Sequence, residues 1–186
     1  RKMKKTLRII VPCRITPVKN ILKIILSLRN LIGNVEVHLF GEIGDLNYWS
    51  KCKEEISKLP NNIKFKYKGS VKPKKLFEIY PNYNVFLMPS LSENFGYSIF
   101  EALSFGLPVI IGQNNPWIGM EKQKIGFNVD PKNIKNISEK LQYYINLNEK
   151  DFVKIRKNCF LFVKNNIIKS NADAKRKILN IFNFKL

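Results

Sequence analysis

Short apolar runs alternate along the chain with longer stretches in which apolar residues recur every three or four positions. The short runs are rich in Ile, Val and Phe and are bounded by Gly, Pro or Asn, which is typical of buried strands. They predict six strands, at residues 7–11, 35–40, 63–67, 84–88, 107–111 and 126–130. The helical spacing predicts helices at residues 16–31, 45–59, 74–80 and 97–105, and a helical pattern from residue 134 onward with breaks near 148 and 170.

Strands of about five residues that alternate with helices of about ten are typical of right-handed βαβ units. We therefore expect an α/β fold: a Rossmann-like parallel sheet with helices on both faces and a C-terminal helical tail. Ligands of such sheets bind beyond the carboxyl ends of the strands. The loops after the first, third, fourth and fifth strands are therefore the segments in which to look for a site.

Composition and charge narrow the class of protein. The 186 residues include 33 Lys+Arg and 14 Asp+Glu, a formal net charge of +19, and 45% of them are hydrophobic. That hydrophobic content is typical of a folded globular protein, and no run approaches the roughly 18 apolar residues of a membrane span. The basic residues are spread along the chain without a nucleic-acid-binding motif, so we interpret the charge as solvation with weak attraction to anionic membranes.

Cysteine and histidine usage excludes several kinds of site. Cys13, Cys52 and Cys159 are scattered and odd in number, so they form neither a disulfide framework nor a zinc-ligand pattern. This favours a reducing compartment, and we expect a cytoplasmic protein. The only histidine, His38, lies within a predicted strand, which indicates a structural role. A multi-His metal site within the chain is thereby excluded.

The loop after the fourth predicted strand carries the most specific chemistry. Gly96 allows close approach of the backbone to a ligand, and the N–H groups of residues 96–98 open the next helix, where an anion can bind. Glu93 lies in this loop and Glu101 lies one turn into the helix. Ionised carboxylates accept strong hydrogen bonds from hydroxyl groups. The pair therefore indicates a phosphate that is flanked by sugars.

The loop after the first predicted strand adds two cations, Arg14 and Lys19. Both are expected at the same sheet edge as Gly96. Arg binds phosphate through a bidentate fork and Lys as a point charge, so the two residues and the helix terminus would form a clamp for a diphosphate. A diphosphate between a sugar and a ribose is a nucleotide sugar. Each of these charged residues, taken singly, is also consistent with an ordinary solvated surface charge.

These segments carry a family resemblance. Residues 89–109, with Glu93 and Glu101 in an E-x7-E arrangement, resemble the corresponding segment of retaining GT-B glycosyltransferases of the group 1 family, as does Arg14-Ile-Thr-Pro-Val-Lys19. The resemblance covers about residues 7–165. It implies that this stretch is the nucleotide-sugar-binding domain, that residues 1–6 are a basic linker remnant, and that residues 166–186 are a helical tail that contacts a missing N-terminal domain.

The resemblance also implies a role for each site residue. Arg14 and Lys19 would contact the donor diphosphate, and Glu93 would face the donor sugar; these three are the expected catalytic residues. Glu101 would bind the ribose hydroxyls. The remaining donor-binding residues would act mostly through the backbone, around the sugar and phosphates or around the nucleobase: Asn94, Phe95, Gly96, Tyr97, Gly69 and Val71. For Tyr97 and for the nearby Trp117, a packing role of the ring is equally open.

Two residues depart from the family pattern. Cys13 stands where the family usually has Gly before the Arg, and Asn94 replaces a Gly after the first Glu. Cys is small, which is compatible with close approach of the loop, and Asn tolerates positive φ better than most residues, so the change at Asn94 is mild. The first residue is Arg, not Met, from which we expect the chain to be a piece of a longer protein.

The implied function is transfer of a sugar, with retention, from a UDP- or GDP-linked donor to a hydroxylated acceptor, either a glycan or a lipid-linked molecule. No cofactor and no metal are expected. The expected partners are the nucleotide sugar, the missing N-terminal domain and, peripherally, the inner face of the membrane, but not nucleic acid. The fragment alone is expected to bind donor without turnover.

Two alternatives stay open at this point. The first is an enzyme of the same fold that uses the same clamp, either a nucleotide-sugar epimerase or a phosphorylase. The second is a non-catalytic basic module that binds nucleic acid or an anionic surface, for which binding would depend steeply on salt.

Overall fold

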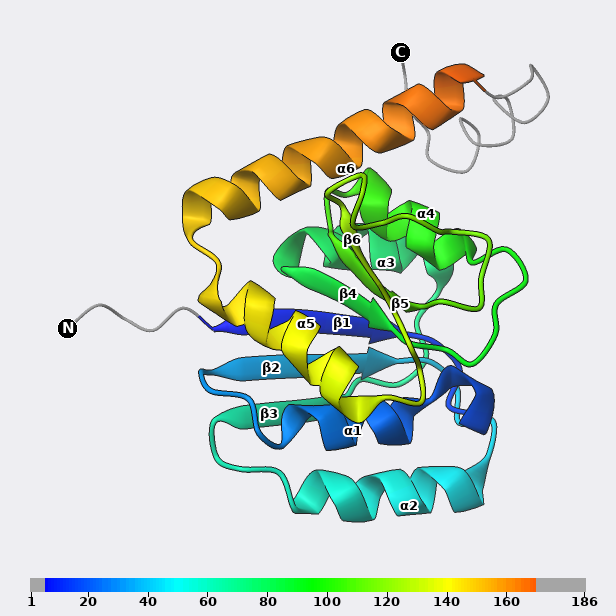
Figure 1. The fold of residues 1–186 in the computed structure, drawn as a ribbon. Helices are drawn as coiled ribbons and strands as arrows, with labels where there is room; N and C mark the ends of the chain where they lie inside the picture. The colour runs from blue at the N-terminus through cyan, green and yellow to red at the C-terminus, as the bar shows by residue number, and fades with distance from the viewer. Residues whose placement is uncertain (1–5, 170–186) are drawn as a thin grey trace.

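The computed structural model describes residues 6–169 and contains one parallel sheet of six strands in the order β3-β2-β1-β4-β5-β6 (Figure 1). All six predicted strands are present, within two residues of their expected bounds. The strands are β1 (Leu7–Pro12), β2 (Val35–Phe40), β3 (Ile63–Tyr67), β4 (Val85–Met88), β5 (Val109–Gly112) and β6 (Gly126–Val129).

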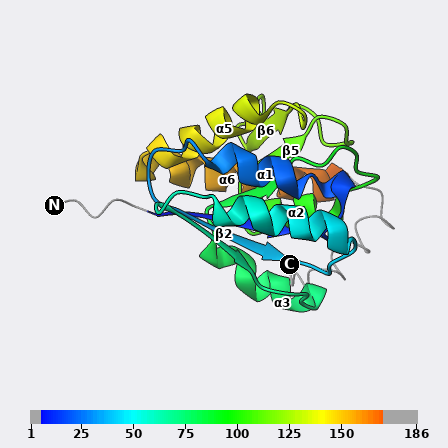
Figure 2. The same cartoon turned by 90° about the horizontal axis from the view of Figure 1, so that it is seen from below.

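Helices cover both faces of the sheet, as expected. The helices are α1 (Ile21–Leu28), α2 (Leu46–Ser57), α3 (Pro73–Ile79), α4 (Tyr97–Ser104), α5 (Ile134–Asn146) and α6 (Glu149–Lys169), with short 3-10 helices η1 (Pro17–Lys19) and η2 (Tyr80–Asn82). Helices α1, α2 and α5 cover one face of the sheet, where α1 packs between the other two, and α3 lies on the opposite face of the sheet (Figure 2). Helix α6 packs against α4 and crosses the β6 end of the sheet (Figure 1).

The core lies between these layers and explains the apolar runs. All four residues of β4 and of β5 are buried, because both faces of these inner strands are covered. The outer strand β3 has only Ile63 buried, which matches its alternation of apolar and basic residues. No helix in the described part of the chain is long and apolar enough to cross a membrane.

The first predicted helix is interrupted, which corrects the sequence-based expectation of a helix from residue 16. Asn20 adopts a left-handed conformation (φ 61°) between η1 and α1. Its side-chain amide is buried and donates to the carbonyls of Pro89 (3.0 Å) and Pro131 (2.6 Å). These long-range bonds fix the break, and through them Asn20 ties the loop after β1 to those after β4 and β6.

The other helix boundaries follow the expected punctuation. Asp45 caps α2 by accepting from the backbone N–H of Tyr48 (2.8 Å), and Gly106, which follows α4, has the left-handed φ of 70° expected at a helix end. The expected break near 148 separates α5 from α6. Helix α6 is continuous to Lys169, across the expected start of the tail at residue 166. The expected break near 170 lies outside the described residues.

Candidate functional site

The strand order places two loops beside the switch point at the carboxyl edge of the sheet. Strands β1 and β4 are neighbours, but the chain continues from β1 toward β2 and from β4 toward β5. Connections that leave in opposite directions open a crevice at that switch point, which is where such sheets bind ligands. Lys19 comes from the loop after β1 and Glu93 from the loop after β4, so the fold brings together two of the predicted site residues.

Lys19 and Glu93 form an ion pair at this switch point. The ammonium nitrogen of Lys19 lies 2.5 Å from Oε1 of Glu93, and the two side chains are only 22% and 13% exposed. The backbone joins the same loops, because the N–H of Leu91 donates to the carbonyl of Val18 (2.9 Å). An ammonium group has three N–H donors. Lys19 can therefore bind an oxyanion while it holds Glu93.

The thiol of Cys13 lies near enough to this pair for both charges to act on it. It is buried, and burial raises its pKa to about 12, although Lys19 acts in the opposite direction. A thiol with that pKa is neutral at physiological pH and is a poor nucleophile. The structure thus supports the expectation that Cys13 packs and does not react.

Arg14 lies in the same loop but is exposed. Its side chain packs on Gly44: a Cβ atom on Gly44 would lie 2.7 Å from the Nε of Arg14. Among residues 6–169, no ion pair joins Arg14 to an acidic side chain. Gly44, which the sequence did not mark as a site residue, therefore provides the space for Arg14 at this edge.

Helix α4 begins at the predicted anion site. Gly96 adopts φ 72° as its N-cap, and no side chain caps the helix. The N–H groups of the first turn, from Tyr97 and Ser98, have no partner within the helix and carry the positive end of its dipole. The rings of Phe95 and Tyr97 flank this terminus. Their centroids lie 4.4 Å apart, and both side chains are exposed. The arrangement suits a phosphate.

Glu101 lies one turn further into α4 and is half-buried. Its Oε2 accepts from the hydroxyl of Tyr80 (3.3 Å). Burial raises the pKa of the Glu101 carboxyl, and the Tyr80 bond only partly opposes that rise. Burial also raises the pKa of Tyr80, so this phenol remains a hydrogen-bond donor. A carboxylate held in this way can accept hydrogen bonds from hydroxyl groups of a ligand.

Gly69 and Val71 follow β3, further along the same edge. Gly69 has φ 75°, and its carbonyl accepts from the N–H of Gly41 (2.9 Å), which ties the ends of β2 and β3 together. Apart from its own chain neighbours, no residue lies within 4 Å of the position that a Gly69 Cβ would take, so the space on that side of Gly69 is open. Val71 is partly buried against the core.

The loop between β5 and β6 braces the loop that carries Glu93, which the sequence analysis did not predict. Three hydrogen bonds join the two loops: Glu93 N–H to the Asn114 carbonyl (3.2 Å), Asn114 side-chain amide to the Leu91 carbonyl (3.1 Å), and Trp117 indole N–H to the Phe95 carbonyl (2.6 Å). We call these three bonds the loop brace. They fix every second residue of the stretch from Leu91 to Phe95, directly before Gly96.

Trp117 links this brace to the helices. Its ring lies 5.9 Å from Phe100 of α4 and 6.3 Å from Phe162 of α6, measured between ring centroids. Its carbonyl accepts from the side-chain amide of Asn128 in β6 (2.7 Å). The open question about this residue is thus answered in favour of packing combined with a directional bond to the site loop.

Taken together, the fold is the Rossmann-like half of a GT-B protein, with its polar crevice at the switch point of the sheet. The chain belongs to the family described as glycosyl transferases group 1, whose model matches residues 1–159. The family resemblance drawn from Glu93, Glu101, Arg14 and Lys19 is therefore confirmed.

Two curated relatives are similar over part of the chain. The sulfoquinovosyl transferase SQD2 of Arabidopsis thaliana is 35% identical over 104 residues, which cover 54% of this chain and 20% of that protein. The GtfA subunit of the UDP-N-acetylglucosamine–peptide N-acetylglucosaminyltransferase of Streptococcus agalactiae is 29% identical over 168 residues, which cover 84% of this chain and 32% of that protein. The chain thus spans a fifth to a third of these relatives.

Solved structures show the same fold. A glycosyltransferase from Rickettsia africae has a TM-score of 0.73 at 25% identity, over 87% of this chain and 43% of that one. Alr3699/HepE of Anabaena, solved in complex with UDP and glucose, has a TM-score of 0.70 at 19% identity, over 86% of this chain and 44% of that one. The chain therefore spans less than half of either structure.

Proposed function

We propose that this chain binds a nucleoside-diphosphate sugar at the crevice between β1 and β4, as the donor-binding half of a glycosyltransferase. The observation that carries the proposal is the Lys19–Glu93 ion pair at the switch point of the sheet. A cation for phosphate and a carboxylate for hydroxyl groups stand there in direct contact, beside an uncapped helix terminus.

In this proposal the positive charges hold and stabilise the diphosphate. Lys19 and the N–H groups at the start of α4 bind the phosphates, and Arg14, which is exposed on the same edge, swings onto them from Gly44. When the bond between sugar and phosphate breaks, negative charge develops on the leaving diphosphate. Fixed cations and a helix terminus directed at that charge lower the barrier by electrostatic stabilisation. They would supply the charge that a metal ion would otherwise provide.

The remaining site residues orient the two ends of the donor. Glu93 accepts hydrogen bonds from the sugar hydroxyls, next to the backbone of Asn94 and Phe95. Glu101 accepts from the ribose, one helical turn beyond the start of α4, with its carboxylate held by Tyr80. The open backbone at Gly69 and the adjacent Val71 suit a nucleobase that is bound mostly through main-chain groups.

For the complete enzyme we propose transfer of the sugar to a hydroxylated acceptor with retention at the anomeric carbon, using a UDP- or GDP-linked donor. UDP is the nucleotide we favour, because the Streptococcus relative is named for a UDP-linked sugar and the Anabaena protein was solved with UDP. The acceptor side would come from a second half that this chain does not include. The chain alone would bind donor without turning it over.

Calorimetric titration of UDP into the chain and its Lys19→Ala variant tests this proposal. Loss of a charged hydrogen bond costs about 1.5–3 kcal/mol, so Lys19→Ala should weaken UDP binding roughly 10- to 150-fold. The matched control is Lys51→Ala, which removes the same charge from the exposed face of α2 and should leave the affinity unchanged. Equal UDP affinities for wild type and Lys19→Ala would refute the proposed clamp.

A second titration separates the ribose end from the diphosphate end. Glu101→Gln keeps the shape of the side chain but removes its charge. We expect it to weaken UDP binding more than the binding of inorganic pyrophosphate, since only UDP carries the ribose hydroxyls. Equal losses for both ligands would remove Glu101 from the ribose site.

A further inference from the structure

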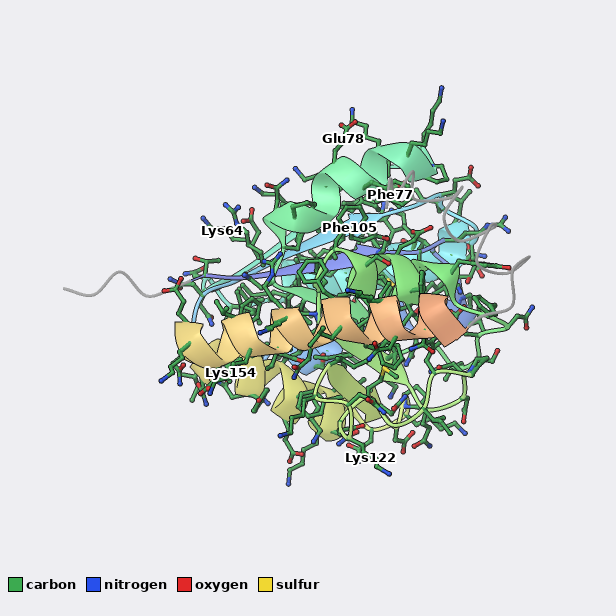
Figure 3. The ribbon with its side chains drawn as sticks, turned by 90° about the horizontal axis from the view of Figure 1, so that it is seen from above. Lys64, Phe77, Glu78, Phe105, Lys122 and Lys154 are labelled. Carbon is green, nitrogen blue, oxygen red and sulfur yellow. The ribbon has the colours of Figure 1, made fainter. Side chains whose placement is uncertain are left out.

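Two adjoining hollows form one groove along α6. The larger has a volume of about 740 Å³ and lies between α5, α6 and the amino end of β6. The smaller, of about 460 Å³, continues along α6 beside residues 122–124, and both have Lys124 and Asn158 in their walls. In Figure 3, Lys154 marks the α6 wall of the larger hollow and Lys122 a wall of the smaller one. We call this feature the α6 groove. The larger hollow adjoins the amino end of β6, whereas the candidate donor site lies at the carboxyl ends of the strands.

An aromatic cluster forms one wall of the larger hollow. The rings of Phe127, Tyr143 and Tyr144 meet edge to face, with centroids 5.2–5.7 Å apart. The ammonium group of Lys140 lies 4.6 Å from the centre of the Phe127 ring, and Tyr144 is buried. Tyr143, which is 42% exposed, therefore offers the accessible aromatic surface. A flat ring of this kind packs against the apolar face of a ring-shaped ligand.

Carboxamide side chains line the smaller hollow. Gln123, Asn158, Asn165 and Asn166 all contribute to its walls. A carboxamide both donates and accepts hydrogen bonds, as a hydroxyl group does. The Asn158 amide is oriented by a bond to the Lys124 carbonyl (3.3 Å). Lys122 and Lys124 also line this hollow. Over both hollows together, four lysines accompany three acidic residues, so the groove as a whole carries little net charge.

The charge of the larger hollow is balanced, in contrast to the rest of the chain. It contains three acidic residues and three lysines: Glu121, Glu139, Asp151, Lys124, Lys140 and Lys154. Over the whole chain the numbers are 14 acidic and 33 basic residues. A site for an anion is expected to carry an excess of positive charge. The balance therefore favours a neutral ligand.

We propose that the α6 groove binds a neutral oligosaccharide. One sugar ring would pack on Tyr143, and its hydroxyl groups would bond to the carboxylates around it. Further sugars would follow α6 along the row of carboxamides. Phe162 lines the smaller hollow, and its ring packs on Trp117 of the loop brace, which connects this part of the groove to the loop that carries Glu93. The proposal goes beyond donor binding and does not depend on it.

Saturation-transfer NMR with two neutral probes, maltotriose and tri-N-acetylchitotriose, tests the proposal on this chain. We expect transfer from the protein to the ring protons of at least one probe. Tyr143→Ala should abolish the transfer, and Tyr143→Phe, which keeps the ring, should retain it. Asn165→Ala, an exposed change on α6, should reduce it, which keeps the test valid if Tyr143→Ala does not fold. Raising the salt from about 0.05 to about 0.5 M should leave the signal unchanged, since screening acts on charges.

The same variants separate this proposal from donor binding. Lys19→Ala should lose UDP binding and keep the saccharide signal, whereas Tyr143→Ala should lose the saccharide signal and keep UDP binding. The proposal is overturned if neither probe shows transfer with the wild-type chain, if transfer survives both Tyr143→Ala and Asn165→Ala, or if it falls steeply with salt.

Discussion

Replacing Trp117 by Phe removes one hydrogen bond from the loop brace while an aromatic ring stays in place. The lost bond runs from the indole N–H to the Phe95 carbonyl, at 2.6 Å. Phe95 directly precedes Gly96, whose left-handed conformation opens helix α4 toward the candidate phosphate site. The other two bonds of the brace remain: Asn114 accepts one from Glu93 and donates the other to Leu91. The variant therefore loosens the site loop at one point without removing any group that touches the ligand.

The size of the effect follows from that single bond. A typical hydrogen bond contributes about 0.5–1.5 kcal/mol net. If the loop must adopt the braced conformation to bind phosphate, this free energy is lost from ligand binding, and the affinity for UDP falls roughly 2- to 13-fold. The loss should be smaller than that of Lys19→Ala, because Lys19 carries a charge and contacts the ligand directly.

Calorimetry with UDP, accompanied by thermal unfolding, measures the effect. The matched control is Trp49→Phe on α2, where the buried indole packs 5.1 Å from the Tyr67 ring, measured between centroids. This control should lower the melting temperature and leave UDP affinity unchanged. It also leaves Trp117 as the only tryptophan, whose fluorescence should respond to UDP. Unchanged affinity in Trp117→Phe, or an equal loss in Trp49→Phe, would refute the role of the brace.

Three further predictions concern stability and reactivity. Burial raises the pKa of the Glu101 carboxyl above its ordinary value of 4.5. The folded state therefore holds the carboxyl proton more tightly than the unfolded state does. The contribution of Glu101 to stability consequently falls as the pH rises above 4.5 and through the pKa of the folded state. Urea midpoints of wild type should therefore decline relative to Glu101→Gln between about pH 4.5 and 7; parallel profiles would contradict this. Burial raises the pKa of Cys13 and Cys159 to about 12 and of Cys52 to about 11, so a thiol reagent at mildly alkaline pH should label the folded chain slowly and all three residues after denaturation. One fast thiol in the folded chain would be inconsistent with this burial. Gly96→Ala should cost about 1–2 kcal/mol of stability, as seen in urea unfolding, because φ is positive there, and should also weaken UDP binding; a variant as stable as wild type would show that the turn tolerates a side chain.

The sequence was informative wherever a signal is local. Apolar runs predicted all six strands. β4 and β5 are buried at every position because both of their faces are covered, and β3 at the edge of the sheet alternates apolar and basic residues. The meeting of Lys19 with Glu93 was also predictable, since parallel strands bring their carboxyl ends to one edge and the two residues follow strands that are neighbours in the sheet.

The remaining features depend on contacts between distant segments. The left-handed Asn20 is held by carbonyls 69 and 111 residues away, so nothing in its neighbourhood marks the break before α1. Trp117 and Phe95 are 22 residues apart in two irregular loops, where no periodic pattern links them. The α6 groove likewise lies between α6 and segments distant from it in sequence, α5 and residues 121–127, and has no signature in any one of them.

The central claim is that a nucleoside diphosphate binds between β1 and β4, and mapping of UDP onto the chain by amide chemical-shift changes in NMR tests it most directly. We predict that the largest changes fall on residues 13–19 and 93–98, with smaller ones near residues 69–71, and that Lys19→Ala removes them. Changes that are confined to other parts of the chain, or that persist in Lys19→Ala, would contradict the claim.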